Sequence, residues 1–181
     1  MRKVLYAVFA ASAAIGIMLP AAASAATTPI RNVTSGCSHT SHCGGQNLLA
    51  PELALSVDSD SAGKGSPVEV RKPAANKKQD FLISGPATDV TIEWAPNGAT
   101  SGLCISEPST SINTGLVLRK CNGSDYQTWA PGDFIMHESF NAWVNKASGF
   151  AMTDPNSGPS GTQLVSGKAG TASNEEWEAI A

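Results

Sequence analysis

The chain has 181 residues, of which 15% are charged, and its formal net charge is −3. This acidic balance argues against nucleic acid and anionic membrane surfaces as partners, because both require a concentrated positive face. The chain also contains 17 glycines and 11 prolines, without an apolar stripe of helical period. That composition predicts one all-β domain of short strands joined by many turns.

The first 25 residues have the pattern of a cleaved signal peptide. Arg2 and Lys3 precede an apolar run over residues 4–19, and the small residues at 23–25 suit a cleavage site. The run is shorter than the roughly 20 apolar residues of a membrane-spanning helix. We therefore expect a secreted, extracellular product, and no later stretch is apolar enough to predict a membrane span.

Residues 26–46 form an arm rich in Ser, Thr and Gly, in which Cys37 and Cys43 enclose His39 and His42. These donor types suit zinc, but so short a segment closes poorly into a tetrahedron. Export also favours oxidation of the thiols over metal ligation. We therefore expect oxidised cysteines in the arm and no metal site.

The rest of the chain, residues 47–181, repeats at an interval of 48 residues. The repeat is clearest at three similar endings: Gln79-Asp80-Phe81, Gln127-Thr128-Trp129 and Glu175-Glu176-Trp177. A fixed period of this length indicates one supersecondary unit used three times, each copy burying its apolar face against the others. The predicted units are 47–84, 85–131 and 132–181.

The same order of parts occurs in each unit. A short strand leads to a turn-rich loop, a second strand, a polar bend and the Gln-x-aromatic strand. The first strands are expected at 53–56, 103–106 and 150–153, and the second strands begin at 68, 116 and 164. Units two and three also share an earlier strand built on Trp94 or Trp143. Short strands and turns repeated threefold predict an all-β barrel with pseudo-threefold symmetry.

The repeat also predicts how the four cysteines pair. Cys104 and Cys121 occur together in unit two, and units one and three lack both. Joint presence and joint absence predict a Cys104–Cys121 disulfide within unit two. Cys37 and Cys43 would then close a small loop in the arm.

Unit two resembles the repeat of the ricin B-type lectin domain, a β-trefoil family. The family unit reads roughly Cys-Leu-Asp, Gly, an apolar strand, Cys, Gly and Gln-x-Trp. The matching segments are 103–106, 115–118, 121–123 and 127–129. Unit three has Glu175 in place of the Gln, and unit one has Phe81 in place of the Trp. The resemblance covers about residues 47–181 and implies a secreted, single-domain member of bacterial type that binds carbohydrate without catalysis.

The motif residues are expected to brace the fold. Strand alternation places Gln127 and Trp129 on the same side, and the same holds for Gln79 with Phe81 and for Glu175 with Trp177. The three rings would supply a threefold core. A Gln amide donates and accepts at once, so it can satisfy buried backbone groups beside the bend.

The resemblance implies a shallow sugar site made by an Asp after the first strand, an aromatic platform and an Asn before the Gln. This chain lacks the Asp in all three units, keeps the Asn only in unit three, and has no aromatic residue in the loops where a platform is expected. The Asp position holds Ser56, Ser106 and Thr153, and the Asn position holds Lys78, Tyr126 and Asn174. The leading candidate site is Asp154 with Asn174 in unit three. The alternative is that Asp154 only begins a turn.

Unit two offers a second candidate site, in which Glu107, Asn113, Asp125 and Tyr126 converge on one loop face and Tyr126 provides an exposed ring. Tyr126 could equally be a surface strand residue that covers its neighbours. Basic pairs also follow the second strand of units one and two, Arg71-Lys72 and Arg119-Lys120. We interpret them as solvated strand edges protected by charge, with contact to an acidic polysaccharide as the alternative.

No catalytic motif is present in the sequence, whether a Gly-x-Ser-x-Gly elbow, a phosphate-cradling loop or a His-Glu-x-x-His helix. We therefore expect neither an enzyme nor a cofactor. The predicted partner is an extracellular carbohydrate or glycoconjugate. The competing hypothesis is a trefoil that has lost sugar binding and contacts a secreted protein, as an inhibitor or interaction module, because a fold alone does not decide function.

Overall fold

The computed structural model describes residues 30–32, 53–74, 76–86, 88–132, 141–155, 159–169 and 176–179. The predicted signal peptide, the Cys37–Cys43 loop and the motif residue Glu175 lie outside these segments. The described elements are strands, together with two 3-10 turns, η1 (Pro96–Gly98) and η2 (Asp125–Gln127). Within this part of the chain, no helix has the length and apolarity that crossing a bilayer requires.

The strands fall into three groups that follow one another along the chain. The first contains β1 (Ile30–Asn32), β2 (Leu53–Val57), β3 (Val68–Arg71) and β4 (Phe81–Ser84). The second contains β5 (Thr91–Trp94), β6 (Leu103–Ser106), β7 (Val117–Lys120) and β8 (Trp129–Gly132). The third contains β9 (Asn141–Asn145), β10 (Phe150–Thr153), β11 (Thr162–Gln163), β12 (Val165–Lys168) and β13 (Glu176–Ala179).

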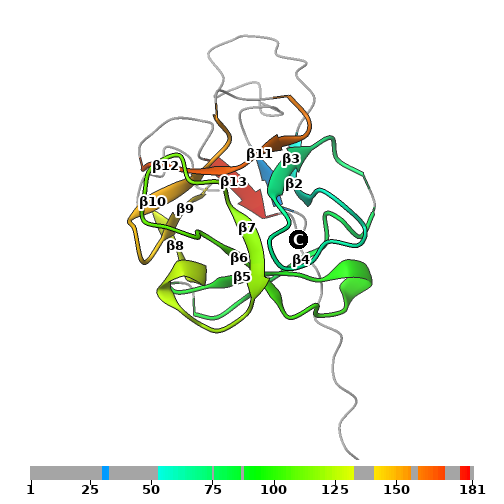
Figure 1. Cartoon of the computed structure of the whole chain (residues 1–181), viewed down its shortest axis with the longest axis horizontal. Helices are drawn as coiled ribbons and strands as arrows, with labels where there is room; N and C mark the ends of the chain where they lie inside the picture. Colours follow the sequence, from blue (N-terminus) through cyan, green and yellow to red (C-terminus); the bar gives the residue numbers. More distant parts are fainter. Residues whose placement is uncertain are drawn as a thin grey trace, which may run out of the picture.

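The pairing of strands is antiparallel and equivalent in the three groups. Within a group the first strand pairs with the second and the second with its partner across the loop: β1–β2–β3, β5–β6–β7 and β9–β10–β12. Between groups, β4 pairs with β5, β8 with β9 and β13 with β1, so the three units join in a closed cycle. Figure 1 shows them around the centre of the view in cyan, green and orange. This is the all-β, threefold arrangement that the repeat predicted.

Strand β1 lies within the predicted arm. Its backbone pairs with β2 and β13, as β5 pairs with β6 and β4. It therefore takes the place in unit one that the Trp94 and Trp143 strands hold in the other units. The repeat did not reveal it, because residues 33–52 separate it from β2 and it carries no tryptophan.

A ring of three backbone hydrogen bonds marks the centre of the threefold arrangement. Val68 N donates to Leu116 O at 3.0 Å, Leu116 N to Leu164 O at 2.8 Å, and Leu164 N to Val68 O at 2.9 Å. These three residues are 48 positions apart and fully buried. The ring satisfies three buried donors and three buried acceptors at once, which a buried backbone requires. The period read from the sequence therefore holds at the level of single hydrogen bonds.

A second set of three bonds ties each unit's loop to the next unit's strand. The donors adopt positive φ, 94° for Gly65, 61° for Asn113 and 95° for Gly161. Glycine reaches this left-handed region without strain, and asparagine tolerates it better than other side chains. The bonds are Gly65 N to Leu118 O at 2.7 Å, Asn113 N to Ser166 O at 2.7 Å, and Gly161 N to Val70 O at 2.6 Å.

The core is one cluster of apolar side chains to which all three units contribute. Phe81 is fully buried, Trp129 is 1% exposed, and both belong to this cluster together with Trp94 and Trp143. Aromatic rings bury large apolar areas, so these residues dominate the stabilisation of the core. The side chain of Trp177 lies outside the described residues.

The glutamines of units one and two brace the bend before the motif strand through equivalent contacts. Both side chains are buried, with 5% of Gln79 and 2% of Gln127 exposed. In each, Nε2 donates to a strand carbonyl and Oε1 accepts a backbone N–H from the bend. The bonds are Gln79 to Lys72 O (2.9 Å) and from Ala74 N (2.7 Å), and Gln127 to Lys120 O (3.0 Å) and from Asn122 N (2.9 Å).

The predicted disulfide of unit two is present. Cys104 in β6 bonds to Cys121, just after β7, and their Cα atoms are 5.0 Å apart. The bond therefore cross-links the two strands of one hairpin, in which Cys104 lies opposite Arg119. The Cys37–Cys43 pair lies outside the described residues and stays a prediction.

Candidate functional site

The structure describes only one half of the predicted unit-three site. Asp154 directly follows β10 and is buried, with 1% of its surface exposed. Its proposed companion, Asn174, lies outside the described residues. The Asp154–Asn174 site therefore stays a prediction.

Of the four candidates of unit two, Glu107 and Tyr126 line the same pocket, whereas Asn113 and Asp125 do not line it. It is an open depression of about 490 Å³, a size typical of small-molecule sites. Its lining is mainly polar and combines hydroxyl, amide and basic groups with the Tyr126 ring. The other lining residues that matter here are Ser106, Asn122, Ser124, Lys64, Arg119 and Lys120.

Backbone bonding brings Glu107 and Tyr126 together. Glu107 follows β6, and its N–H donates to the carbonyl of Tyr126 at 3.0 Å. The same carbonyl accepts a bond of 3.1 Å from Nδ2 of Asn145, which is fully buried in β9 of unit three. Tyr126 lies in the turn η2, and 44% of its side chain is exposed. The turn therefore presents the ring to solvent while its backbone is held from both sides.

Glu107 is fully buried, which is uncommon for a carboxyl group. Its Oε2 accepts a hydrogen bond from the hydroxyl of Ser148, in the turn between β9 and β10, whereas Oε1 has no partner among the described residues. Burial raises the pKa of the Glu107 carboxyl above its ordinary value, and the hydroxyl groups of Ser148 and Ser166 oppose part of this rise. Although Glu107 lines the pocket, its carboxyl group is thus enclosed by the protein and is not presented to solvent.

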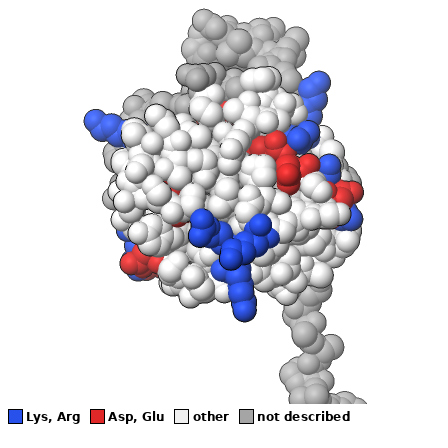
Figure 2. Space-filling view, viewed as in Figure 1, with Lys and Arg blue, Asp and Glu red and all other residues white. Residues whose placement is uncertain are grey.

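Three basic side chains surround the pocket. Lys64, Arg119 and Lys120 are exposed, and none of them takes part in the ion pairs found between described residues. Figure 2 shows a cluster of Lys and Arg on this face, over β7 and separate from the acidic patches. The sequence pattern identified Arg119 and Lys120 as a basic pair but did not identify Lys64, which lies in the loop of unit one.

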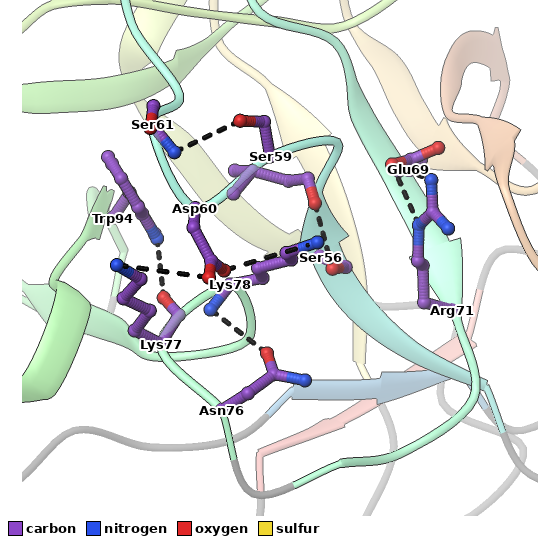
Figure 3. Close-up of polar contacts among 11 residues, drawn as sticks. Ser56, Ser59, Asp60, Ser61, Glu69, Arg71, Asn76, Lys77, Lys78 and Trp94 are labelled. Atoms are coloured by element: carbon purple, nitrogen blue, oxygen red, sulfur yellow. Dashed lines mark hydrogen bonds and ion pairs between the residues drawn. The ribbon is translucent and has the colours of Figure 1, made fainter.

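The equivalent place in unit one is filled by contacts within the protein. Val57 replaces Glu107 and Lys78 replaces Tyr126, and Val57 N donates to Lys78 O at 3.0 Å, as Glu107 does to Tyr126. Asp60 lies between Lys77 and Lys78, at 3.8 and 4.0 Å from their Nζ atoms (Figure 3). Asp60 offsets one of the two positive charges here, and the apolar side chain of Val57 offers no hydrogen-bonding group.

The described residues provide no group of three or more His, Cys, Asp or Glu side chains that could hold a metal ion. The cysteines and histidines of the arm lie outside this part of the chain. The chemistry of the unit-two pocket is therefore interpreted from its hydroxyl, amide, carboxyl and basic groups.

No protein-family model matches the chain, and no curated protein is similar to it in sequence. Solved structures are similar in fold. The designed threefold-symmetric protein ThreeFoil superposes with a TM-score of 0.69 at 17% identity, over 85% of this chain and 97% of its own. The Rhizoctonia solani agglutinin gives 0.64 at 15% identity, over 90% and 99%.

An enzyme also contains this fold as a part. The exo-β-1,3-galactanase 1,3Gal43A from Clostridium thermocellum gives a TM-score of 0.67 at 12% identity, over 86% of this chain but only 30% of its own. Together with the strand pairing, these similarities define the class of protein: the chain has a lectin-like β-trefoil fold. At such low identity they show the fold and leave function to the site.

Proposed function

We propose that the protein is a secreted, non-catalytic carbohydrate-binding protein whose principal site is the unit-two pocket. The observation that carries the proposal is the exposed ring of Tyr126 beside hydroxyl, amide and basic groups in one open depression. A sugar presents an apolar C–H face on one side and a set of hydroxyl groups around its edge. The ring offers a stacking surface for the first, and the exposed amide of Asn122 and the half-buried hydroxyl of Ser124 offer hydrogen bonds for the second.

Two further arguments support this function. Agglutinins and lectins recur among the proteins of similar fold, although the galactanase contains the fold within an enzyme. The signal-peptide pattern of residues 1–25 supports export, and the lack of a nucleophile or metal motif in the sequence supports a role without catalysis.

The test is binding of the protein to an array of immobilised glycans, after expression of the full chain and purification from the culture medium. We expect an N-terminus near residue 26 and binding to a restricted set of glycans. Tyr126→Ala removes the stacking surface and should weaken binding about tenfold, the effect of roughly 1.4 kcal/mol. The matched control is Ile112→Ala, another exposed large side chain, which does not line the pocket.

Two results would contradict the proposal. The first is the absence of binding to any glycan, which together with capture of a secreted protein would favour the interaction-module hypothesis. The second is binding that Tyr126→Ala and Ile112→Ala leave equally unchanged, which would place the sugar elsewhere, with the Asp154–Asn174 site as the next candidate.

A further inference from the structure

The position of Lys64 beside the unit-two pocket is set by backbone bonding between units. Gly65 N donates to Leu118 O at 2.7 Å, and Leu118 N donates to Ser66 O at 2.9 Å. These two bonds attach the loop of unit one to β7, one residue before Arg119. Since Gly65 has a φ of 94°, which other residues rarely adopt, the turn that carries Lys64 is well defined. Lys64 therefore lines the same pocket as Arg119 and Lys120.

An equivalent backbone bond joins units two and three, but fewer basic side chains lie beside it. Asn113 N donates to Ser166 O at 2.7 Å, which makes Ile112 the counterpart of Lys64. The residues that follow Ser166 are Gly167 and Lys168, where unit two has Arg119 and Lys120. One lysine is thus present at this place instead of three basic groups.

The attachment of unit three to unit one also contains polar groups, but its arginine forms an ion pair. Ser160 is the counterpart of Lys64, and its hydroxyl accepts a bond from Lys72 N at 3.2 Å. The guanidinium of Arg71, which corresponds to Arg119, is bound by Glu69 at 2.8 Å. Of these three equivalent places, only the one beside the pocket gathers three basic groups without an ion-pair partner among the described residues.

We propose that the unit-two pocket selects glycans that carry an anionic group, a carboxylate or a sulfate ester, through Lys64, Arg119 and Lys120. This inference rests on the proposed function and concerns which sugars the same site takes. With the sugar ring on Tyr126, its anionic group reaches the basic residues and forms charge-assisted hydrogen bonds, which are stronger than neutral ones. Arg119 can bind both oxygens of such a group side by side.

Because the chain has a net negative charge, attraction of an anionic glycan requires a local group of basic residues. The net charge is −3, so the protein as a whole does not attract anions. Three unpaired basic groups in one depression give a local positive potential that can outweigh it at short range. Glu107 opposes this potential, but its burial disfavours the charged form of its carboxyl group.

The experiment compares glycans that differ only in charge. Isothermal titration is carried out with oligogalacturonides and their methyl esters, and with a sulfated galactan oligosaccharide and its desulfated form. We expect the charged member of at least one pair to bind about tenfold more tightly, and this preference to shrink as salt is raised from 50 to about 500 mM because salt screens exposed charges. The pair that shows it identifies the anionic group as carboxylate or sulfate.

Variants then assign the preference to the pocket. The triple variant Lys64→Gln, Arg119→Gln, Lys120→Gln should bind both members of the pair equally. The matched controls are Lys72→Gln and Lys168→Gln, exposed lysines at the positions threefold-equivalent to Lys120. They remove one charge each from the same strand position and should leave the preference intact.

Each outcome separates this inference from the function on which it rests. If charged and neutral glycans bind equally, or the triple variant keeps the preference, anion selection is wrong while carbohydrate binding stands. If neither member of any pair binds and the glycan array is also empty, both proposals are wrong.

Discussion

Units one and two make equivalent backbone contacts but differ in the side chains at the position of the pocket. Both brace the bend with a glutamine, and both join a residue at the end of β2 or just after β6 to the residue before that glutamine by a 3.0 Å hydrogen bond. In unit one these two residues are Val57 and Lys78, and in unit two they are Glu107 and Tyr126. Since these backbone contacts are equivalent, a pocket can be gained or lost by side-chain replacement without disturbing the fold.

The strongest destabilisation is expected from removal of the disulfide, which unit two has and unit one lacks. Cys104→Ala with Cys121→Ala gives unit two the alanines that unit three has at 151 and 169. The bond constrains a hairpin with a sequence separation of 17, so its loss should lower the free energy of unfolding by about 3 kcal/mol. Chemical denaturation measures this, and the reduced wild type should behave like the variant. An unchanged midpoint would mean that the hairpin is held by its strand pairing alone.

The second prediction tests whether the two glutamines are equivalent. Gln79→Met and Gln127→Met keep the shape of the side chain but remove the part-buried hydrogen bonds to the Lys72 or Lys120 carbonyl and from a bend N–H. We expect each variant to lose about 1–3 kcal/mol of unfolding free energy, and the two losses to agree within a factor of two. Denaturant titration of both variants measures the losses. A loss confined to one unit would show that the brace matters in that copy only.

The smallest expected effect is the pH dependence contributed by Glu107. Because burial raises its pKa in the folded state, the folded protein holds the proton more tightly than the unfolded chain. Stability from this group is therefore present below its ordinary pKa, about 4.5, and is lost as pH rises through the raised folded-state value. Thermal denaturation between pH 4 and pH 8 should show a steeper decline with pH for the wild type than for Glu107→Gln. Parallel curves would mean that Glu107 ionises as freely as an exposed carboxyl group.

The sequence was sufficient to predict the repeat and the features that depend on it. The period of 48 residues is matched in the structure, where Val68, Leu116 and Leu164 occupy equivalent places in a closed hydrogen-bond ring. The Cys104–Cys121 bond followed from the same alignment. Strand β1 was not predicted, because residues 33–52 interrupt the period in unit one.

The content of the pocket was only partly predictable, because it depends on contacts between units. Glu107 and Tyr126 were candidates, but the burial of Glu107 depends on its contact with Ser148 of unit three. Lys64 reaches the pocket through the Gly65–Leu118 bond, which joins units one and two. A sequence pattern indicates which residues a unit contains, whereas contacts of this kind follow only from how the units are assembled.

The central claim, that sugar binds at unit two through Tyr126 and its neighbours, is tested most directly by a ¹⁵N-labelled NMR titration with the glycan that binds best. We expect chemical-shift changes to concentrate on Ser106, Glu107, Asn122 and Tyr126, and the equivalent residues of unit one, including Val57 and Lys78, not to shift. Changes centred on unit one, or spread equally over the three units, would contradict it.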